Sequence, residues 1–304
     1  MNPTTSPDSY DNFKSGFVAI VGAPNAGKST LLNRMLGQKI AITSKKPQTT
    51  RNRILGVLDR PQAQLIFLDT PGIHRAEKLL NVRIVDVALA ALADADVALV
   101  MLDVATPNSD AEAYLIEKLG TVATPTVLAL NKIDLIAKPE LLAVIDHWSK
   151  SHAFQAIVPI SAEKGDQVDA LIDTLVRLMP AGPPFYPPGS LTDMSERFIA
   201  AEMIREKAFR LTGEEVPYAV AVTIDAFKEE KNGRLIAIDA TLHVERDSQK
   251  GILIGKGGRK LKEIGEAARK EIERMVGAQV FLKLFVRVQK NWSRDAKALE
   301  RFGY

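Results

Sequence analysis

The sequence predicts a doubly wound α/β domain with a mainly parallel sheet, followed by a smaller α+β domain. In the first half, short apolar runs alternate with amphipathic segments, which is typical of β-α-β units around a sheet covered on both faces. Residues 179–190 contain five prolines and two glycines, a composition that ends regular structure and forms a semi-rigid linker. Beyond this run the pattern changes to helix, two strands, a short helix, a glycine-rich turn, a helix and a strand.

The elements follow from the spacing of apolar residues. The expected strands of the first domain are Phe17–Gly22, Ile54–Asp59, Leu65–Asp69, Val97–Asp103, Thr126–Asn131 and Ala156–Ile160. The expected helices are Lys28–Leu36, Val82–Ala93, Asp110–Leu119, Glu140–Lys150 and Val168–Met179. In the second domain we expect helices at Glu196–Leu211 and Arg259–Val276 and strands at Tyr218–Phe227, Arg234–Glu245 and Val280–Gln289. The predicted divisions are a polar tail 1–15, a first domain 16–180, a linker 181–195, a second domain 196–290 and a basic tail 291–304.

Composition excludes several classes of protein. The 304 residues exceed the usual size of one domain and contain no cysteine, so disulfide scaffolds, cysteine nucleophiles and thiolate metal sites are excluded. The longest apolar stretch, Val87–Leu102, is interrupted by Asp94 and Asp96, so nothing is long enough to span a bilayer. We therefore expect a soluble, cytosolic protein.

Charge is unevenly distributed along the chain. Residues 1–182 carry a net charge of −1, residues 183–245 carry −4 and residues 246–304 carry +8. A basic terminal segment on a nearly neutral body indicates a polyanionic partner, either nucleic acid or a membrane surface. Charge alone does not choose between these two partners.

A phosphate-binding loop follows the first strand. Residues 22–29 match the pattern G-x-x-x-x-G-K-S/T and lie between a strand and a helix, as this motif requires. Its glycines let backbone N–H groups point at phosphate oxygens, Lys28 reaches the β/γ-phosphates, and the Ser29 hydroxyl can ligate Mg²⁺. The predicted nucleotide contacts here are Gly22, Ala23, Pro24, Asn25, Ala26, Gly27, Lys28, Ser29 and Thr30.

A second motif lies about forty residues downstream, at the end of the strand Leu65–Asp69. The carboxylate of Asp69 can hold Mg²⁺ through water, and the backbone N–H of Gly72 can approach a γ-phosphate. Ile73 follows, and its apolar side chain cannot polarise an attacking water. The predicted contacts of this segment are Asp69, Thr70, Pro71, Gly72 and Ile73.

The third motif decides which base is bound. Asp134 can accept hydrogen bonds from both N1–H and the 2-amino group of guanine, whereas adenine would leave this carboxylate unpaired. A backbone N–H after the strand Ala156–Ile160 can reach the guanine oxygen. The sequence therefore predicts a GTP site rather than an ATP site, with contacts from Asn131, Lys132, Ile133, Asp134, Ser161 and Ala162.

The loop Pro47–Arg51 contains two threonines, either of which can complete the Mg²⁺ shell and sense the γ-phosphate. We choose Thr50 over Thr49. The predicted metal ligands are Ser29, Thr50 and Asp69, and the predicted catalytic groups are Lys28, Thr50 and Gly72. His74 could be a base, but a solvated loop histidine is the preferred interpretation.

The basic segment contains a G-x-x-G turn at Gly255–Gly258, between an apolar run and an amphipathic helix. Such a turn lets the backbone pack against four nucleotides of single-stranded nucleic acid. The predicted RNA contacts are Lys250, Ile254, Gly255, Lys256, Gly257, Gly258, Arg259, Lys260 and Lys262.

The last strand places Phe281, Lys283, Phe285 and Arg287 on one face, where they could stack bases and hold phosphates. We prefer the alternative, that the two phenylalanines pack against a helix or the first domain. The basic tail 291–304 is expected to be a solvated terminal helix.

Together these motifs resemble the Era family of GTPases, in the group that includes TrmE and Der, whose phosphate loop reads G-x-P-N-x-G-K-S. The similarity covers the entire chain. It implies a P-loop GTPase domain followed by a type II KH domain, GTP or GDP as ligand, Mg²⁺, and a potassium ion that Asn25 helps to hold, which adds Asn25 to the predicted catalytic groups. Because a water-orienting glutamine is replaced by Ile73, hydrolysis is expected to be slow.

The resemblance also implies a partner and a role. Era relatives bind single-stranded RNA at the 3′ end of small-subunit (16S) ribosomal RNA and act in maturation of the small (30S) ribosomal subunit. The alternative hypothesis is a membrane-associated signalling switch whose KH-like domain is only a scaffold, with weak peripheral contact through the tail. We expect a monomer in either case.

Overall fold

The computed structural model describes most of the chain. The described residues are 12–44, 50–73, 79–213, 216, 219–230 and 233–304. They form two compact units, and each is described by itself. The first unit holds the described residues of Met1–Ile40, Arg53–Ala76 and Val85–Asp193, and the second those of Ala41–Asn52, Glu77–Ile84 and Met194–Tyr304.

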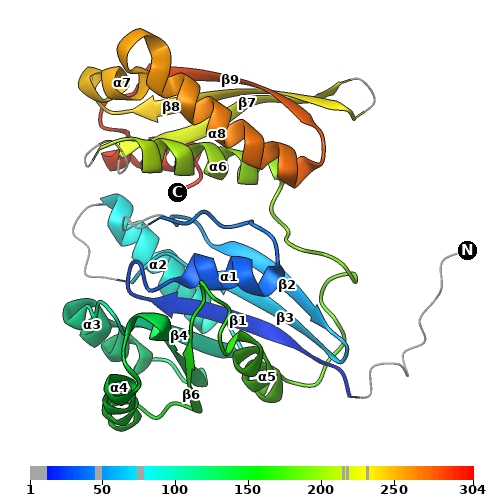
Figure 1. The fold of residues 1–304 in the computed structure, drawn as a ribbon, viewed down its shortest axis with the longest axis vertical. Coiled ribbons are helices and arrows are strands. Elements are labelled where there is room, and N and C mark those ends of the chain that lie inside the picture. Colours follow the sequence, from blue (N-terminus) through cyan, green and yellow to red (C-terminus); the bar gives the residue numbers. More distant parts are fainter. Residues whose placement is uncertain (1–11, 45–49, 74–78, 214–215, 217–218, 231–232) are drawn as a thin grey trace, which may run out of the picture. The chain divides into compact units, whose positions relative to one another are not determined.

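The first unit is built on a sheet with the strand order β2-β3-β1-β4-β5-β6 (Figure 1). Only the β2–β3 pair among these described strands is antiparallel, and the others are parallel. Parallel order brings the carboxyl ends of β1, β3, β4 and β5 to one edge of the sheet, where ligands of such folds bind. The strands are β1 Lys14–Gly22, β2 Ile54–Arg60, β3 Ala63–Asp69, β4 Val97–Asp103, β5 Thr126–Asn131 and β6 Ala156–Ile160.

Helices cover both faces of this sheet. Side chains of α2 and α3 join one buried cluster with the strands, and helices α1 and α5 contact the opposite face (Figure 1). Burial on both faces explains why the strands are almost continuously apolar. The helices are α1 Lys28–Leu36, α2 Leu79–Ala93, α3 Ser109–Leu119, α4 Lys138–Ser151 and α5 Val168–Leu178.

The proline-rich segment lies against the first unit. The N–H of Val57 donates to the carbonyl of Leu191 (2.9 Å), and the Thr192 hydroxyl donates to the carbonyl of Leu55 (2.5 Å). The side chain of Gln64 exchanges hydrogen bonds with the backbone of Tyr186. This segment therefore binds along β2, the edge strand, and satisfies backbone groups that an open edge would leave exposed.

The second unit contains a sheet with the order β7-β8-β9, in which β7–β8 is antiparallel and β8–β9 is parallel. Buried side chains of α6 and α8 supply its core, with Ile264, Ala268 and Ile272 forming the inner face of α8. The elements are α6 Glu196–Leu211, β7 Ala221–Glu230, β8 Leu235–Val244, α7 Asp247–Ile254, η4 Lys256–Gly258, α8 Arg259–Val276, β9 Gln279–Val288, η5 Trp292–Arg294 and α9 Ala296–Arg301.

The terminal segment contains a short helix, as predicted, but the prediction that this segment is solvated is wrong. Trp292 and Leu299 are fully buried in one cluster with Ala221, and the indole N–H of Trp292 donates to the carbonyl of Ala219 (3.0 Å). Basic residues of the tail remain outside, but its apolar residues are used in the core of the second unit. Among the helices of the described residues, none is both long and apolar enough to cross a membrane.

Candidate nucleotide and nucleic-acid sites

The loop between β1 and α1 adopts a conformation that needs small residues. Gly27 has φ 99°, and a Cβ added there would lie 2.2 Å from Nδ2 of Asn131. Asn25 also has a positive φ, 66°. Left-handed backbone at such positions allows successive N–H groups of a loop to face one point, the arrangement that binds anions.

The side chain of Lys28 is buried inside this loop. Its Nζ donates to the carbonyl oxygens of Gly22 (3.0 Å) and Ala23 (2.9 Å). Burial lowers the pKa of Lys28 to about 8, and the nearby charge of Asp69 opposes this shift. A cation held at this point by backbone carbonyls is positioned to meet the charge of phosphate groups.

Ser29 and Asp69 converge beside the loop. The Ser29 hydroxyl donates to Oδ2 of Asp69 at 2.6 Å. The other carboxylate oxygen, Oδ1, is buried without a hydrogen-bond partner among the described residues. Burial raises the pKa of Asp69 to about 6, against the opposing effects of Ser29 and Lys28. A hydroxyl and a buried carboxylate with an unpaired oxygen form a donor set that suits Mg²⁺.

The segment after β3 approaches the phosphate loop closely. A Cβ on Gly72 would lie 2.7 Å from the backbone of Pro24, so only glycine fits there. The N–H of Ile73 donates to the carbonyl of Gly22 (3.0 Å), and the Ile73 side chain is fully buried in the core. The Thr70 hydroxyl donates to the carbonyl of Ile20 (2.8 Å). Because the side chain of Ile73 points into the core, it cannot contact a nucleophilic water.

Asn131 joins three loops of the site. Its Nδ2 donates to the carbonyl of Ala26 (2.7 Å), and its Oδ1 accepts from the N–H of Ala162 (2.9 Å). The next residue, Lys132, has φ 70° and forms an ion pair with Asp103 at the end of β4. The buried amide therefore sets the distance between the phosphate loop and the segment predicted to bind the base.

Asp134 lies beside the segment that contains Ser161. The Ser161 hydroxyl bonds to the Asp134 carboxylate and lowers its pKa, and Lys164 adds to the effect from 3.5 Å. The side chain of Asp134 is 11% exposed. An ionised carboxylate with limited solvent access is the acceptor that guanine N1–H and the 2-amino group need.

Thr49 and His74 lie outside the described residues, so nothing is added to their predictions. Thr50 is buried and belongs to the second unit. Its role as a metal ligand stays a prediction, because the geometry above joins residues of the first unit only.

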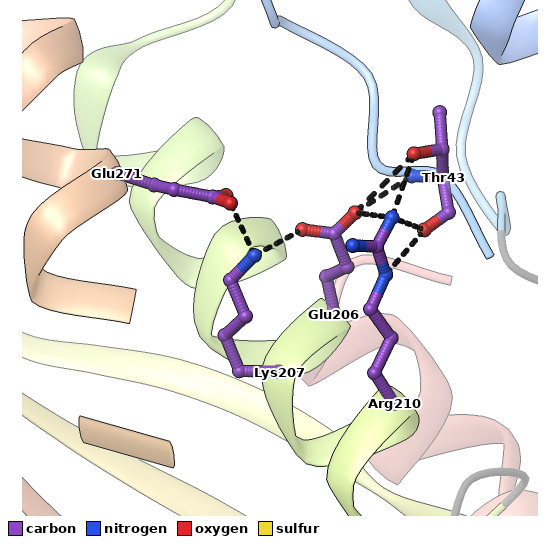
Figure 2. A network of polar contacts seen from close by, with 5 residues as sticks. All are labelled: Thr43, Glu206, Lys207, Arg210 and Glu271. Carbon is purple, nitrogen blue, oxygen red and sulfur yellow. Dashed lines mark hydrogen bonds and ion pairs between the residues drawn. The ribbon is translucent and has the colours of Figure 1, made fainter. Parts of the chain in front are cut away.

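The segment that follows α1 is held in place by side chains that the sequence analysis did not identify. Figure 2 shows the side chains of Glu206 and Arg210, both from α6, hydrogen-bonded to Thr43. The Thr43 N–H donates to Oε1 of Glu206 (3.0 Å), and the Arg210 guanidinium donates to the Thr43 carbonyl (2.9 and 2.6 Å). On the other side Lys207 pairs with Glu206 and with Glu271 of α8. The signal was present in the sequence: α6 has charged residues on every side, so some of them had to be buried.

The other described end of this segment is also anchored. Arg51 is buried and donates to the carbonyl of Val220 (2.9 Å) and to the hydroxyl of Tyr304 (3.2 Å). Its guanidinium lies 5.3 Å from the ring centre of Tyr304 and 5.7 Å from that of Trp292. Both described ends of the loop that contains Thr50 are therefore fastened to the second unit.

The G-x-x-G turn is open on its outer side. Gly255, Gly257 and Gly258 have φ of 69°, 61° and 78°, and a Cβ on Gly257 or Gly258 would meet nothing within 4 Å. The predicted contact residues here are exposed or partly exposed, and none is an acid. A backbone phosphate of a nucleic acid can thus approach the turn without displacing a side chain.

The two phenylalanines on β9 are not packed against a helix of the second unit, so that part of the preferred interpretation is wrong, and packing against the first domain stays a prediction. Phe281 is 54% exposed and Phe285 is 52% exposed, so neither packs into a core. The alternation along the strand is as predicted, but the face with aromatic and basic residues is open.

Comparison with known proteins adds the family. One family model, described as a 50S ribosome-binding GTPase, matches residues 17–132, and a KH domain model matches residues 215–293. The GTPase Era of Geotalea uraniireducens is 53% identical over 292 residues, which cover 96% of this chain and 98% of the relative. The GTPase Era of Geobacter metallireducens is 52% identical with the same coverage.

Two solved structures are similar over nearly the full length. A variant of Aquifex aeolicus Era bound to GDP and AlF₄⁻ has a TM-score of 0.91 and is 42% identical, covering 96% of this chain and 99% of that one. Era in complex with MgGDPNP and nucleotides 1506–1542 of 16S ribosomal RNA has a TM-score of 0.92 with the same identity and coverage. With relatives this similar along both domains, the chain belongs to the Era family of GTPases.

Proposed function

We propose that this chain binds and hydrolyses GTP with Mg²⁺, binds the single-stranded 3′ end of 16S ribosomal RNA, and acts in assembly and maturation of the small (30S) ribosomal subunit. The nucleotide half of the proposal is carried by two hydrogen bonds of Asn131, which donates to the carbonyl of Ala26 and accepts from the N–H of Ala162 and so ties the phosphate loop to the base-binding segment. The RNA half is supported by the similarity to Era in complex with 16S RNA.

The residues of the first unit have distinct roles in this proposal. Lys28 and the loop N–H groups bind the β/γ-phosphates, and Ser29 with Asp69 would hold the metal ion. A bound Mg²⁺ neutralises phosphate charge during phosphoryl transfer. Gly72 brings a backbone N–H to the γ-phosphate, and Asp134 selects guanine. Thr50 is proposed to complete the metal shell.

Hydrolysis is proposed to be slow and assisted by potassium. The buried side chain of Ile73 has no polar group to orient water, so the chain's own contribution is charge stabilisation and positioning. Asn25, with its left-handed backbone at the top of the loop, would help to hold the monovalent cation.

The RNA in a solved relative favours the small ribosomal subunit, rather than the large one, as the proposed partner of this chain. The family model over residues 17–132 is described by the 50S subunit, but it covers only the GTPase part. The structure that matches both domains contains 16S RNA, which belongs to the small subunit.

The membrane alternative has less support. Trp292 and Leu299, the apolar residues that a tail would insert into lipid, are buried in the second unit. We propose a cytoplasmic monomer with at most weak peripheral contact at the membrane, and domains divided as predicted, with 181–195 as the linker.

The test is the affinity for a short RNA from the 3′ end of 16S ribosomal RNA, measured with a GTP analogue and with GDP at one salt concentration. We expect binding in at least one nucleotide state. Gly257→Asp should abolish it, because a carboxylate at the turn repels phosphate, while Asp tolerates the left-handed backbone. Gly213→Asp, also in open space, is the matched control. Absence of RNA binding in both states, together with binding to anionic vesicles, would replace this proposal by the membrane alternative.

A further inference from the structure

The outer row of β9 combines exposed rings with cations. Phe281 and Phe285 are more than half exposed, and Lys283 and Arg287 are exposed between and beyond them. Side chains four residues apart on a strand point the same way and are separated by roughly 13 Å along it. The Nζ of Lys283 lies 5.3 Å from the ring centre of Phe281. The row contains no carboxylate of its own.

The facing side chains of β8 leave these rings uncovered. In the register of the sheet, Ala237 of β8 lies opposite Phe281 and Thr241 lies opposite Phe285. Thr241 is buried, and its hydroxyl donates to Asp225 at 2.6 Å. Neither Ala237 nor Thr241 covers the ring opposite it, so a flat molecule can lie on Phe285, whereas Phe281 already has the cation of Lys283 over its ring.

A cavity connects this row to the helix that precedes the G-x-x-G turn. It has a volume of about 580 Å³, and Phe285 and Arg287 line it together with Lys250 of α7. Lys250 is one of the predicted RNA contacts. Asp225 and Asp247 also line the cavity, but Asp225 is occupied by hydroxyls of Thr223 and Thr241.

We propose that the outer row of β9 is a second RNA surface, on which bases beyond the four held at the G-x-x-G turn stack on Phe285 and Phe281. Lys283 and Arg287 bind the phosphates that join these bases. The inference rests on the proposed RNA-binding function and adds a subsite to it. Base–aromatic stacking with adjacent cations is the usual way to hold single strands without reading their sequence.

Charge favours RNA as the occupant over a protein surface. Cations interrupt the aromatic row at every second outward position, so burial against a protein would leave Lys283 and Arg287 without partners in the row. Residues 246–304, which include the row, carry a net charge of +8. RNA supplies bases that can stack on the exposed rings and phosphates that can pair with the cations between them.

The experiment compares two RNAs on the full chain: four nucleotides that fill the turn, and the same four extended by several nucleotides. In the double variant Phe281→Ala/Phe285→Ala we expect affinity for the longer RNA to fall at least about tenfold, with no change for the shorter one. Phe281→Tyr/Phe285→Tyr keeps the rings and should bind like the wild type. Leu142→Ala removes an exposed apolar side chain of the first unit and is the control.

Lys283→Ala/Arg287→Ala should reduce the salt slope of log affinity for the longer RNA by about 1.4, since each lost phosphate contact removes about 0.7. The proposal is overturned if the double Phe→Ala variant binds both RNAs like the wild type, or if it only abolishes self-association. If the wild type binds neither RNA, the proposed function itself has failed.

Discussion

Asn131 shows how one buried side chain can organise a site made of separate loops. Both ends of its amide are used, one as donor to Ala26 and one as acceptor from Ala162. When one polar group of such a pair is left buried without a hydrogen bond, the folded state loses about 1–3 kcal/mol of stability. The geometry of the base-binding segment therefore depends on an Asn at this position, although the amide itself need not contact the base.

Asp134→Asn should change the base that is bound. An Asn amide no longer accepts from both N1–H and the 2-amino group, but its N–H can donate to the carbonyl that xanthine has at the same position. We expect GTP affinity to fall by about 100-fold or more and affinity for xanthosine triphosphate to rise. Calorimetric titration with both nucleotides checks this. Unchanged GTP affinity would contradict the assignment of Asp134.

His243 should make stability depend on pH. Burial, with the charges of Arg287 and Arg301, lowers its pKa from 6.5 to about 4, and Asp225 opposes the shift. Because the unfolded chain binds the proton more readily, the contribution of His243 to stability is lost as pH drops from 6.5 to about 4, a loss of roughly 3 kcal/mol.

Urea unfolding at a series of pH values measures this loss. His243→Gln has no titrating ring and keeps an amide near Thr223, so its stability should change less over this window. Equal pH dependence in the variant and the wild type would exclude His243 as the cause.

At the scale of elements, helix α6 contacts both the segment that follows α1 and helix α8. Glu206 is fully buried and pairs with Lys207 and Arg210 while it accepts from Thr43 (Figure 2). Thr43 and Arg51, on either side of the loop, are thus held by the unit that contains the G-x-x-G turn. Thr50 lies between these two anchored residues in the sequence.

Glu206→Ala should destabilise the protein by about 1–3 kcal/mol, because the Thr43 N–H loses its acceptor and the buried Lys207 keeps only Glu271. Glu263→Ala removes the exposed pair with Lys260 (2.7 Å) and should cost about 1 kcal/mol or less. The free energy of unfolding in urea distinguishes them. If both variants lower the free energy of unfolding by the same amount, the buried network around Glu206 does not contribute the stability assigned to it.

Element positions followed closely from the sequence where burial is periodic. The helices Lys28–Leu36 and Arg259–Val276 have the predicted bounds, whereas β1 begins at Lys14 and not at Phe17. The ladder continues there because Lys14, Ser15 and Gly16 pair with β3, and backbone hydrogen bonds need no apolar side chain. Sequence patterns detect side-chain burial and miss such extensions.

At the scale of the molecule, the P-loop α/β fold followed by a KH domain is confirmed by relatives similar over 96% of the chain. Charge is concentrated in the second unit, where five predicted contacts are cations: Lys250, Lys256, Arg259, Lys260 and Lys262. Long-range attraction of RNA should therefore come from this unit, and nucleotide selection from the first.

RNA affinity should accordingly depend steeply on salt. If these five cations each meet a phosphate, the slope of log affinity against log salt is roughly −3.5. Lys256→Ala should reduce the slope by about 0.7 for every RNA sequence tested. Fluorescence anisotropy over a range of salt concentrations measures it. A slope near zero would show that these cations do not contact phosphate.

The sequence by itself determined the fold class, the GTP motifs and the G-x-x-G turn, because glycines, acids and apolar periods act locally. Tertiary structure decided the rest. Trp292 is buried by residues about seventy positions away, Thr43 is held by a helix that follows it by more than 150 residues, and Phe281 is exposed while its neighbour Val280 is buried. Such contacts depend on which surfaces meet after folding, and no local pattern of residues encodes that meeting.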